Sequence, residues 1–368
     1  MDILLLMSLI EISLIYYYIN TIGGEKMKAL RKLKAGKGNV AIQEVPEPKI
    51  QPNEVLMKVW AAGVCGSDLL IEDDKHFYKA PVTLAHEFSG VAYKIGKDVR
   101  KIKEGDHIVG DIETPTGWLG VTRDGAYAPY MSMPEDVCYK LPNDFNLDYG
   151  AMTELVTAII HIMQERTSVK AGDFVVVVGP GPMGLLGVQF AKIRGASKVV
   201  LIGLKKDKKR LEVGEKIGAD YILYSDEHPE KTVMELTSGK GADFVLEAAG
   251  ARVGNNIVGA QHAIDCARRA YEGEGGKGEL AFISLWGEPI SLDFDQVCLG
   301  QLNIHGSWSW NGSETWQRSV ELITSGVLNL DPLITNTYAL EEWETAFKRL
   351  RAGEDIKALI CPSGRDWL

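Results

Sequence analysis

Residues 175–184 read Val175-Val176-Val177-Val178-Gly179-Pro180-Gly181-Pro182-Met183-Gly184. A run of β-branched residues leads into a G-x-G-x-x-G turn, and an apolar segment typical of a helix follows. The order of strand, tight turn and helix makes this glycine pattern specific for a dinucleotide. Gly179 allows the turn, Gly181 lets the backbone approach a pyrophosphate, and Gly184 lets the helix pack close to the strand. We therefore expect nucleotide phosphates at the start of this helix, beside Pro182 and Met183.

The length and composition of the chain are those of a large globular protein. Its 368 residues exceed one ordinary hydrophobic core and predict two domains. The net charge of −10 argues against nucleic-acid and anionic-membrane partners. The five cysteines are scattered without a C-x-x-C pair, which is typical of a reducing compartment and predicts a cytoplasmic protein.

Residues 1–26 differ from the rest of the chain. The segment 3–19 is apolar except for Glu11 and two serines. It has no Lys or Arg ahead of it and no small-residue cleavage site, which argues against a signal peptide. It is also short for a membrane span and contains an acidic residue. We interpret residues 1–26 as a non-essential N-terminal extension, with the functional chain opening at Met27; a membrane anchor is the alternative.

The pattern of elements after residue 26 divides the chain into three regions. Residues 27–155 are rich in short strands broken by Gly and Pro, as in a small β-barrel. Residues 156–306 alternate strands with helices, which predicts a doubly wound parallel sheet. We assign residues 307–368 to the same domain as residues 27–155. The predicted α/β architecture is a nucleotide-binding domain inserted into a catalytic domain, with a cleft between them.

Cys65, His86 and Glu87 are candidate metal ligands in the first region. Thiolate and imidazole are suitable ligands for zinc, and a carboxylate can complete a tetrahedron. No local spacing motif joins Cys65 to His86. Each residue alone has an ordinary structural explanation, since a buried free cysteine behaves as a small hydrophobe.

A set of motifs occurs in one order along the chain: Cys65-Gly66-Ser67-Asp68, Leu84-Ala85-His86-Glu87-Phe88-Ser89-Gly90, Gly105-Asp106-His107-Ile108-Val109, Gly125-Ala126-Tyr127-Ala128 and the glycine turn. Together they resemble the zinc-dependent medium-chain dehydrogenase/reductase family, and in particular its sorbitol (polyol) and threonine dehydrogenase branch, from Met27 to about Cys361. The resemblance implies a GroES-like β-barrel catalytic domain in residues 27–155 and 307–368 and a Rossmann domain in residues 156–306. It also implies a zinc-dependent oxidoreductase that transfers hydride between a secondary alcohol, either a polyol or a sugar, and NAD(P). A homodimer or homotetramer is the implied assembly.

The resemblance assigns roles around the metal. Cys65 matches the thiolate ligand of the family and His86 its imidazole ligand. Glu87 matches the neighbouring glutamate, which binds the metal in polyol dehydrogenases. Glu154 falls near the fourth coordination position, where the family has cysteine or glutamate.

Further roles concern the proton and the cofactor. Ser67 matches the hydroxyl that takes the substrate proton, and Asp68 matches a carboxylate that orients a metal ligand. Lys357 matches a basic residue near the cofactor pyrophosphate.

The sequence departs from the family pattern in places. The histidine that often ends the proton relay is Leu70 here, which leaves water or Glu154 as the proton's exit. The usual glycine before the ligand histidine is Ala85. The four-cysteine lobe that binds a structural zinc in many members is missing between residues 110 and 125, so one zinc per chain is expected.

The choice of cofactor depends on the second strand of the nucleotide-binding domain. An acidic residue about 20 positions after the glycine turn usually binds the ribose hydroxyls of NAD. That place is Gly203, and the cations Lys205, Lys206 and Arg210 follow it. The pattern favours NADP over NAD, because nothing there repels a 2′-phosphate. The alternative is that the lysines are a solvated helix start and that Asp207 replaces the missing acid.

Other functions remain open at this stage. L-Threonine is the alternative substrate within the resemblance. A zinc-free NADPH-dependent enone or quinone reductase is a second alternative, although the Cys65, His86 and Glu154 set argues against it. A non-catalytic nucleotide sensor is a third, for which Leu70 is the only indication. Tryptophans 118, 286, 308 and 310 could line a substrate cleft, but aromatic residues more often belong to a core.

Overall fold

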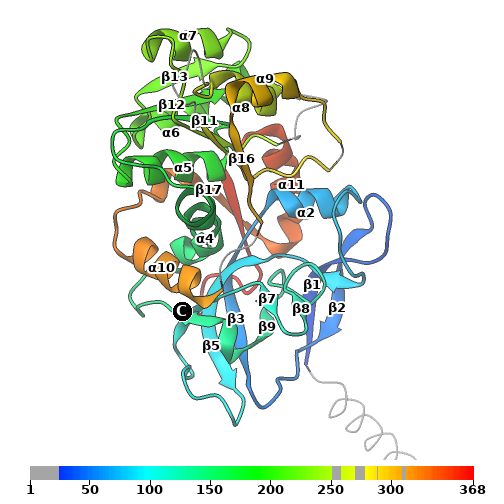
Figure 1. The fold of residues 1–368 in the computed structure, drawn as a ribbon. Coiled ribbons are helices and arrows are strands. Elements are labelled where there is room, and N and C mark those ends of the chain that lie inside the picture. The colour runs from blue at the N-terminus through cyan, green and yellow to red at the C-terminus, as the bar shows by residue number, and fades with distance from the viewer. Residues whose placement is uncertain (1–24, 251–257, 270–277, 288, 309–311) are drawn as a thin grey trace, which may run out of the picture.

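The computed structural model describes residues 25–250, 258–269, 278–287, 289–308 and 312–368. Residues 1–24 of the predicted extension and Trp310 lie outside the described residues. Figure 1 shows a parallel sheet with its helices in the upper part of the molecule and a strand-rich part below it.

The upper part is built on a six-stranded sheet in the order β13-β12-β11-β14-β15-β16, and all its neighbouring strands are parallel. Its strands are β11 (Phe174–Val178), β12 (Lys198–Gly203), β13 (Tyr221–Tyr224), β14 (Phe244–Glu247), β15 (Glu279–Phe282) and β16 (Asn303–Gly306). The associated helices are α5 (Pro182–Ile193), α6 (Lys208–Lys216), α7 (Pro229–Leu236), α8 (Val258–Cys266) and α9 (Phe294–Gly300). The doubly wound parallel sheet predicted from the sequence is confirmed.

Strand β11 lies in the middle of this sheet and is covered on both faces. Val175 and Val177 belong to the core that includes α4 (Thr153–Ile160) and α5, whereas Val176 and Val178 belong to the core on the side of α8. Successive side chains of a strand point to opposite faces, so a run of valines is what a two-sided core requires.

The glycine turn between β11 and α5 can be made only by glycine at two positions. Gly179 has a φ of +105°, and a Cβ there would lie 2.7 Å from the Cα of Ala249. A Cβ on Gly184 would lie 1.8 Å from the carbonyl oxygen of Gly179. A Cβ on Gly181 would meet nothing within 4 Å, so the turn is open on that side. The helix then begins at Pro182, whose missing N–H is not needed there.

The lower part is built from antiparallel strands of the first region and from the end of the chain. A seven-stranded sheet has the order β10-β6-β5-β3-β18-β17, with β9 also paired to β3. Its strands are β3 (Glu54–Gly63), β5 (Glu87–Ile95), β6 (His107–Gly110), β9 (Tyr130–Pro134), β10 (Cys138–Lys140), β17 (Ile334–Ala339) and β18 (Lys357–Cys361). Strand β18 pairs with β3, so the chain does return to its first region, as expected.

Smaller elements complete this part. A three-stranded sheet joins β1 (Lys26–Lys32), β2 (Val40–Pro46) and β4 (Val82–Thr83), and β7 (Glu113–Thr114) and β8 (Gly117–Trp118) form a hairpin. The remaining helices are α2 (Gly66–Glu72), α3 (Leu147–Gly150), α10 (Ser313–Thr324) and α11 (Trp343–Ala352). A π-helical segment, His161–Arg166, continues α4, which lies beside α10 (Figure 1). Short 3-10 turns lie at Glu135–Val137, Lys205–Asp207, Asp331–Leu333 and Leu340–Glu342.

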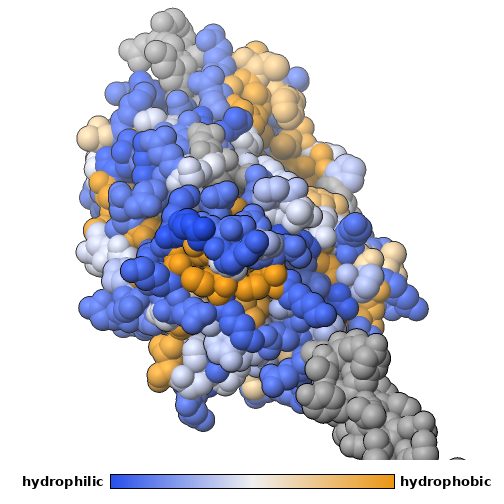
Figure 2. Space-filling model, turned by 90° about the horizontal axis from the view of Figure 1, so that it is seen from below, coloured by the Kyte–Doolittle hydropathy of each residue, from blue (hydrophilic) through white to orange (hydrophobic). Residues whose placement is uncertain are grey.

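The surface of the lower part is mostly polar. Seen from below, hydrophilic residues cover most of the face, and apolar residues gather near its centre (Figure 2). Among the helices in the described part of the chain, none is long and apolar enough to span a bilayer.

Candidate active site

Cys65 lies in the short connection between β3 and α2. It occupies the N-cap position of this helix in an extended conformation, and its backbone N–H donates to Asp68 Oδ2 at 2.9 Å. The same carboxylate oxygen accepts the hydroxyl of Tyr127 at 3.0 Å. Asp68 thus fixes the start of α2, which explains why an acidic residue follows Cys65 at this spacing.

His86 and Glu87 enter the site from the start of β5. Ala85, just before them, has a φ of +76°, a left-handed conformation that costs a residue with a Cβ about 1–2 kcal/mol. This conformation is the physical reason why glycine is usual at this position in the family pattern. The turn directs both His86 and Glu87 into the interior, where they are 6% and 1% exposed.

Cys65, His86 and Glu87 come together as the sequence predicted. One ligand atom from each lies within 4.8 Å of the other two. Among the described residues, His86 Nδ1 and Asp68 Oδ1 are buried without a hydrogen-bond partner. A thiolate, an imidazole and a carboxylate that converge around unpartnered polar atoms fit the ligand chemistry of zinc.

The electrostatics of the cluster favour a cation. Burial lowers the pKa of His86, but the negative charges of Cys65 and Asp68 act against burial. With the further charge of Glu154, they raise this pKa to about 10. A site that stabilises a positive imidazolium this strongly is also suited to hold a divalent metal ion.

Glu154 approaches from α4 and lines the same cavity, but it is not part of the group of three. Burial raises its pKa to about 7, although the charge of His86 acts in the opposite direction. Its place as a metal ligand or as a proton acceptor stays a prediction.

Glu87 has a second partner. Its carboxylate forms an ion pair with Lys357 of β18, and both side chains are 1% exposed. Lys357 Nζ also donates to the carbonyl oxygen of Val64 at 3.0 Å. The sequence analysis assigned Lys357 to the cofactor site and Glu87 to the metal site. In the structure these two side chains form an ion pair with each other. Lys357 lines the same cavity as Pro182 and Met183, which begin the helix after the glycine turn. Its predicted contact with a pyrophosphate stays a prediction.

A single cavity of about 200 Å³ connects the metal cluster to the glycine turn. Cys65, His86 and Glu154 lie in its wall on one side, and Pro182 and Met183 on the other. Ser67 also lines it, and the Ser67 hydroxyl is 3.2 Å from His86 Nε2. Leu70 lies in the same wall, so no proton acceptor stands at that position.

The residues predicted to select NADP lie together at the end of β12. Gly203 is its last residue, and a Cβ there would lie 2.9 Å from both Pro180 Cγ and Leu211 Cδ2. Packing against Pro180 therefore explains the missing acidic side chain. Lys205 pairs with Asp226 and Glu227 at 3.2 and 2.9 Å.

The two other predicted cations differ in their contacts. Arg210 donates to the carbonyl oxygen of Asp355. Lys206 is exposed, and within the described chain it has no hydrogen-bond or ion-pair partner. The carboxylate of Asp207 accepts a hydrogen bond from the backbone N–H of Leu204 at 3.2 Å, so it stabilises the turn at Lys205–Asp207.

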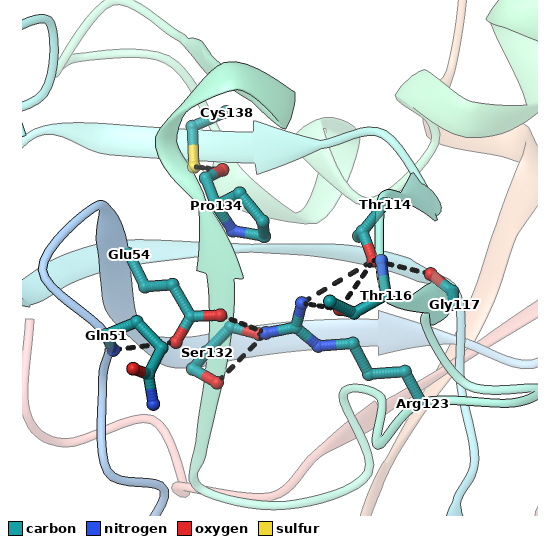
Figure 3. Close-up of polar contacts among 9 residues, drawn as sticks. All are labelled: Gln51, Glu54, Thr114, Thr116, Gly117, Arg123, Ser132, Pro134 and Cys138. Atoms are coloured by element: carbon teal, nitrogen blue, oxygen red, sulfur yellow. Dashed lines mark hydrogen bonds and ion pairs between the residues drawn. The ribbon is translucent and has the colours of Figure 1, made fainter.

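The hairpin β7–β8 lies between residues 110 and 125, the segment in which the sequence has no cysteine, and Arg123 holds the hairpin in place (Figure 3). The guanidinium donates to Thr116 Oγ1 of the hairpin at 2.8 Å. It also pairs with Glu54 of β3 at 2.7 Å and donates to the carbonyl oxygen of Ser132 in β9 at 3.0 Å. One planar side chain thus ties the hairpin to two strands of the large sheet.

Sequence reasoning did not single out several residues that line the cavity, and His76 is the titratable residue among them that lies beside aromatic rings. It follows α2, lines the cavity, and packs its ring 4.5 Å from Phe77 and 6.0 Å from Trp308. Of the tryptophans considered from the sequence, Trp118 and Trp308 line the cavity, whereas Trp286 packs beside Phe282. Nothing in the local sequence distinguishes His76, because only the fold brings it to this wall.

Comparison with known proteins gives a consistent assignment for both parts of the chain. Residues 51–143 match the family model of the alcohol dehydrogenase GroES-like domain, and residues 182–325 match that of zinc-binding dehydrogenases. A sorbitol dehydrogenase of Halalkalibacterium halodurans is 34% identical over 91% of this chain and 99% of its own length. An L-threonine 3-dehydrogenase of Bacillus subtilis is 32% identical over 92% of this chain and 99% of its own length.

Solved structures share the whole fold. A protein of Sinorhizobium meliloti described as a zinc-binding dehydrogenase, solved with NADP bound, superposes with a TM-score of 0.79 at 25% identity. The match covers 92% of this chain and all of the other. The GroES-like and Rossmann parts expected from the sequence are thereby confirmed. This chain belongs to the zinc-dependent medium-chain dehydrogenase/reductase family, whose members are alcohol dehydrogenases that use zinc and a nicotinamide cofactor.

Proposed function

We propose that this enzyme transfers hydride between a secondary alcohol group of a polyol or sugar and NAD(P). The observation that carries the proposal is one cavity whose wall contains both the metal-ligating side chains and the glycine turn for the cofactor. A relative named sorbitol dehydrogenase supports this choice of substrate class. The site would lie between a catalytic domain of residues 27–155 and 307–368 and a nucleotide-binding domain of residues 156–306.

Different residues of the chain would hold the metal and position its ligands. Cys65, His86 and a carboxylate from Glu87 or Glu154 would hold one zinc per chain. When bound, zinc supplies Lewis acidity that lowers the pKa of a hydroxyl group, and the nicotinamide accepts the hydride. Asp68 fixes the turn that carries Cys65 through its hydrogen bond to the Cys65 backbone.

Ser67 handles the substrate proton. Its Oγ lies at the cavity wall, 3.2 Å from His86 Nε2, and it can accept the proton that leaves the substrate hydroxyl. Leu70 cannot pass this proton on, so water or the carboxylate of Glu154 completes the route to solvent.

One experiment separates this function from its alternatives. The purified protein is analysed for zinc and assayed with NAD⁺ and NADP⁺ against sorbitol, cyclic sugars, L-threonine and isopropanol. We expect about one zinc per chain and turnover of polyols or sugars, and Cys65→Ala should lose both metal and activity. Full activity of Cys65→Ala would favour a zinc-free reductase, preferential turnover of L-threonine would favour a threonine dehydrogenase, and no turnover at all would favour a nucleotide sensor.

We infer that NADP is preferred over NAD. Gly203 leaves no carboxylate to repel a 2′-phosphate, and the exposed Lys206 is available to pair with one. The relative from Sinorhizobium meliloti was solved with NADP, which supports the same choice.

We also propose a cytoplasmic homodimer or homotetramer. Every cysteine of the chain is a free thiol in the structure, which suits a reducing compartment. Light scattering of the purified protein would give the mass of the assembly, and a monomeric mass would contradict this proposal.

A further inference from the structure

Four aromatic rings meet at the wall of the cavity. Trp118 of β8 stacks on Trp308, with ring centroids 5.5 Å apart and planes at 28°. Phe77 packs edge-on against Trp118 at 5.1 Å, and the ring of His76 stacks on Phe77. We call His76, Phe77, Trp118 and Trp308 the aromatic wall. Phe77 and Trp308 are 51% and 46% exposed, so these rings are not an ordinary core.

The aromatic wall joins separate parts of the chain. His76 and Phe77 follow the helix that begins next to Cys65, Trp118 lies on the hairpin held by Arg123, and Trp308 follows the last strand of the parallel sheet. Three of the rings also line the cavity that contains the metal cluster. A substrate bound at that cluster therefore shares the cavity with these rings.

His76 provides a polar atom within this wall. Its Nδ1 lies 2.7 Å from the carbonyl oxygen of Phe77, which can only accept, so Nδ1 carries the hydrogen. In the neutral ring, Nε2 is then an acceptor. Among the described residues, this Nε2 is a buried atom without a partner. Burial also lowers the pKa of His76, which keeps the ring neutral.

The charges around the cavity argue against an anionic substrate. Within the described residues, Lys357 is the only lysine or arginine that lines it, and Glu87 neutralises its ammonium group. Glu113, an acidic residue, lines the cavity as well. Apart from the proposed zinc, a phosphate or carboxylate group would find no lysine or arginine in the described part of the wall that lacks a counter-charge, whereas an uncharged hydroxyl group needs none.

We propose that the aromatic wall binds one face of an uncharged sugar ring and that His76 Nε2 accepts a hydrogen bond from one of its hydroxyl groups. The C–H groups on the face of a pyranose can lie flat on an indole, whereas an open-chain polyol offers no such face. The inference rests on the proposed function and makes it more specific. In the reaction, a ring carbon gives its hydride to the nicotinamide and its hydroxyl proton to Ser67, which leaves a carbonyl group, or a lactone if the anomeric carbon reacts.

The test compares substrates and variants under steady-state conditions. D-Glucose and D-galactose serve as ring sugars, sorbitol as an open chain and isopropanol as a small alcohol that has no ring face to stack. Trp118→Leu removes one stacking face, and His76→Phe keeps the stack but removes the acceptor. Trp367→Leu is the matched control, because its ring packs on Trp60 at 5.6 Å and is not part of the cavity wall.

We expect the wild type to prefer a ring sugar. Trp118→Leu should raise KM for that sugar by about 3- to 10-fold, and His76→Phe should raise it by about 3- to 10-fold. KM for isopropanol should stay unchanged in both variants, and Trp367→Leu should change neither value. A merely structural role would alter all substrates together and would overturn the inference.

Other outcomes are equally decisive. Preferred turnover of sorbitol, L-threonine or a sugar phosphate over the neutral ring sugars would also overturn the inference while leaving an alcohol dehydrogenase. If the zinc-loaded wild type oxidises none of the alcohols, isopropanol included, the proposed function itself fails.

Discussion

We propose that the Ser67 hydroxyl moves the substrate proton, and its replacement gives a direct test. We expect Ser67→Ala to keep its zinc but to slow alcohol oxidation by about 100- to 10,000-fold, the usual effect of losing a proton-transfer group. Hydroxide can take the proton instead, so a higher pH should partly rescue the variant. Metal analysis and kcat across a pH series measure both effects. An unchanged kcat at neutral pH would move the proton step to Glu154 or to water.

Single residues show where sequence reasoning succeeds and where it ends. Cys65 and His86 could be singled out as candidate ligands because short motifs surround them, and the Asp68 cap on the Cys65 backbone gives one of these motifs a local structural reason. His76 was missed because its role depends on rings that approach from other parts of the chain. Gly203 was read as a cofactor signal, and the structure adds a packing reason, since Pro180 leaves no room for a Cβ.

At the scale of elements, we propose that the turn after β12 selects between NADP and NAD. Lys206→Glu places a negative charge where the 2′-phosphate of NADP is expected. Loss of a charge-assisted hydrogen bond should lower kcat/KM for NADP by about 10- to 100-fold, with little change for NAD. Lys216→Glu, at the far end of α6, makes the same change in net charge and is the control. Equal effects of the two variants, or no effect of Lys206→Glu, would remove this turn from cofactor selection.

The hairpin β7–β8 depends on Arg123 for its position. Arg123→Met removes the contacts to Thr116, Glu54 and Ser132, so the hairpin should open more often. Hydrogen–deuterium exchange should become faster in a peptide that covers residues 113–118 and remain unchanged in α5. Arg123→Lys keeps the charge but not the planar fork, so it should fall between the wild type and Arg123→Met. Unchanged exchange in residues 113–118 would show that other contacts hold the hairpin.

Elements of the nucleotide-binding part could be predicted closely, whereas the hairpin could not. Strands such as β11 and β12 are continuous apolar runs between glycine turns, so local sequence is enough to find them. The hairpin consists of two-residue strands, and the nearby Arg123 ties it to Glu54, which lies 69 positions away in the sequence. Long-range contacts of this kind leave no periodic pattern in the sequence.

At the scale of the whole molecule, the end of the chain completes the active site. Strand β18 pairs with β3, and this register brings Lys357 against Glu87, although 270 positions separate the two residues in the sequence. Sequence reasoning predicted that the last region returns to the first. It could not predict this ion pair, because the pairing of β18 with β3 is set only in the folded chain.

Removal of Lys357 should therefore destabilise the folded chain as well as disturb the site. Lys357→Met leaves the carboxylate of Glu87 buried without its counter-charge, and the loss of one partner from a buried pair costs about 3–5 kcal/mol. Chemical denaturation, followed with and without added zinc, measures the change in the free energy of unfolding. Lys28→Met is the control, since it breaks the exposed pair of Lys28 with Glu341 and should cost less than about 1 kcal/mol. The double variant Lys357→Met with Glu87→Gln should recover much of the loss, because no unpaired charge remains. If Lys357→Met costs no more than Lys28→Met, or if the double variant recovers nothing, the ion pair does not stabilise the contact between the end of the chain and the site.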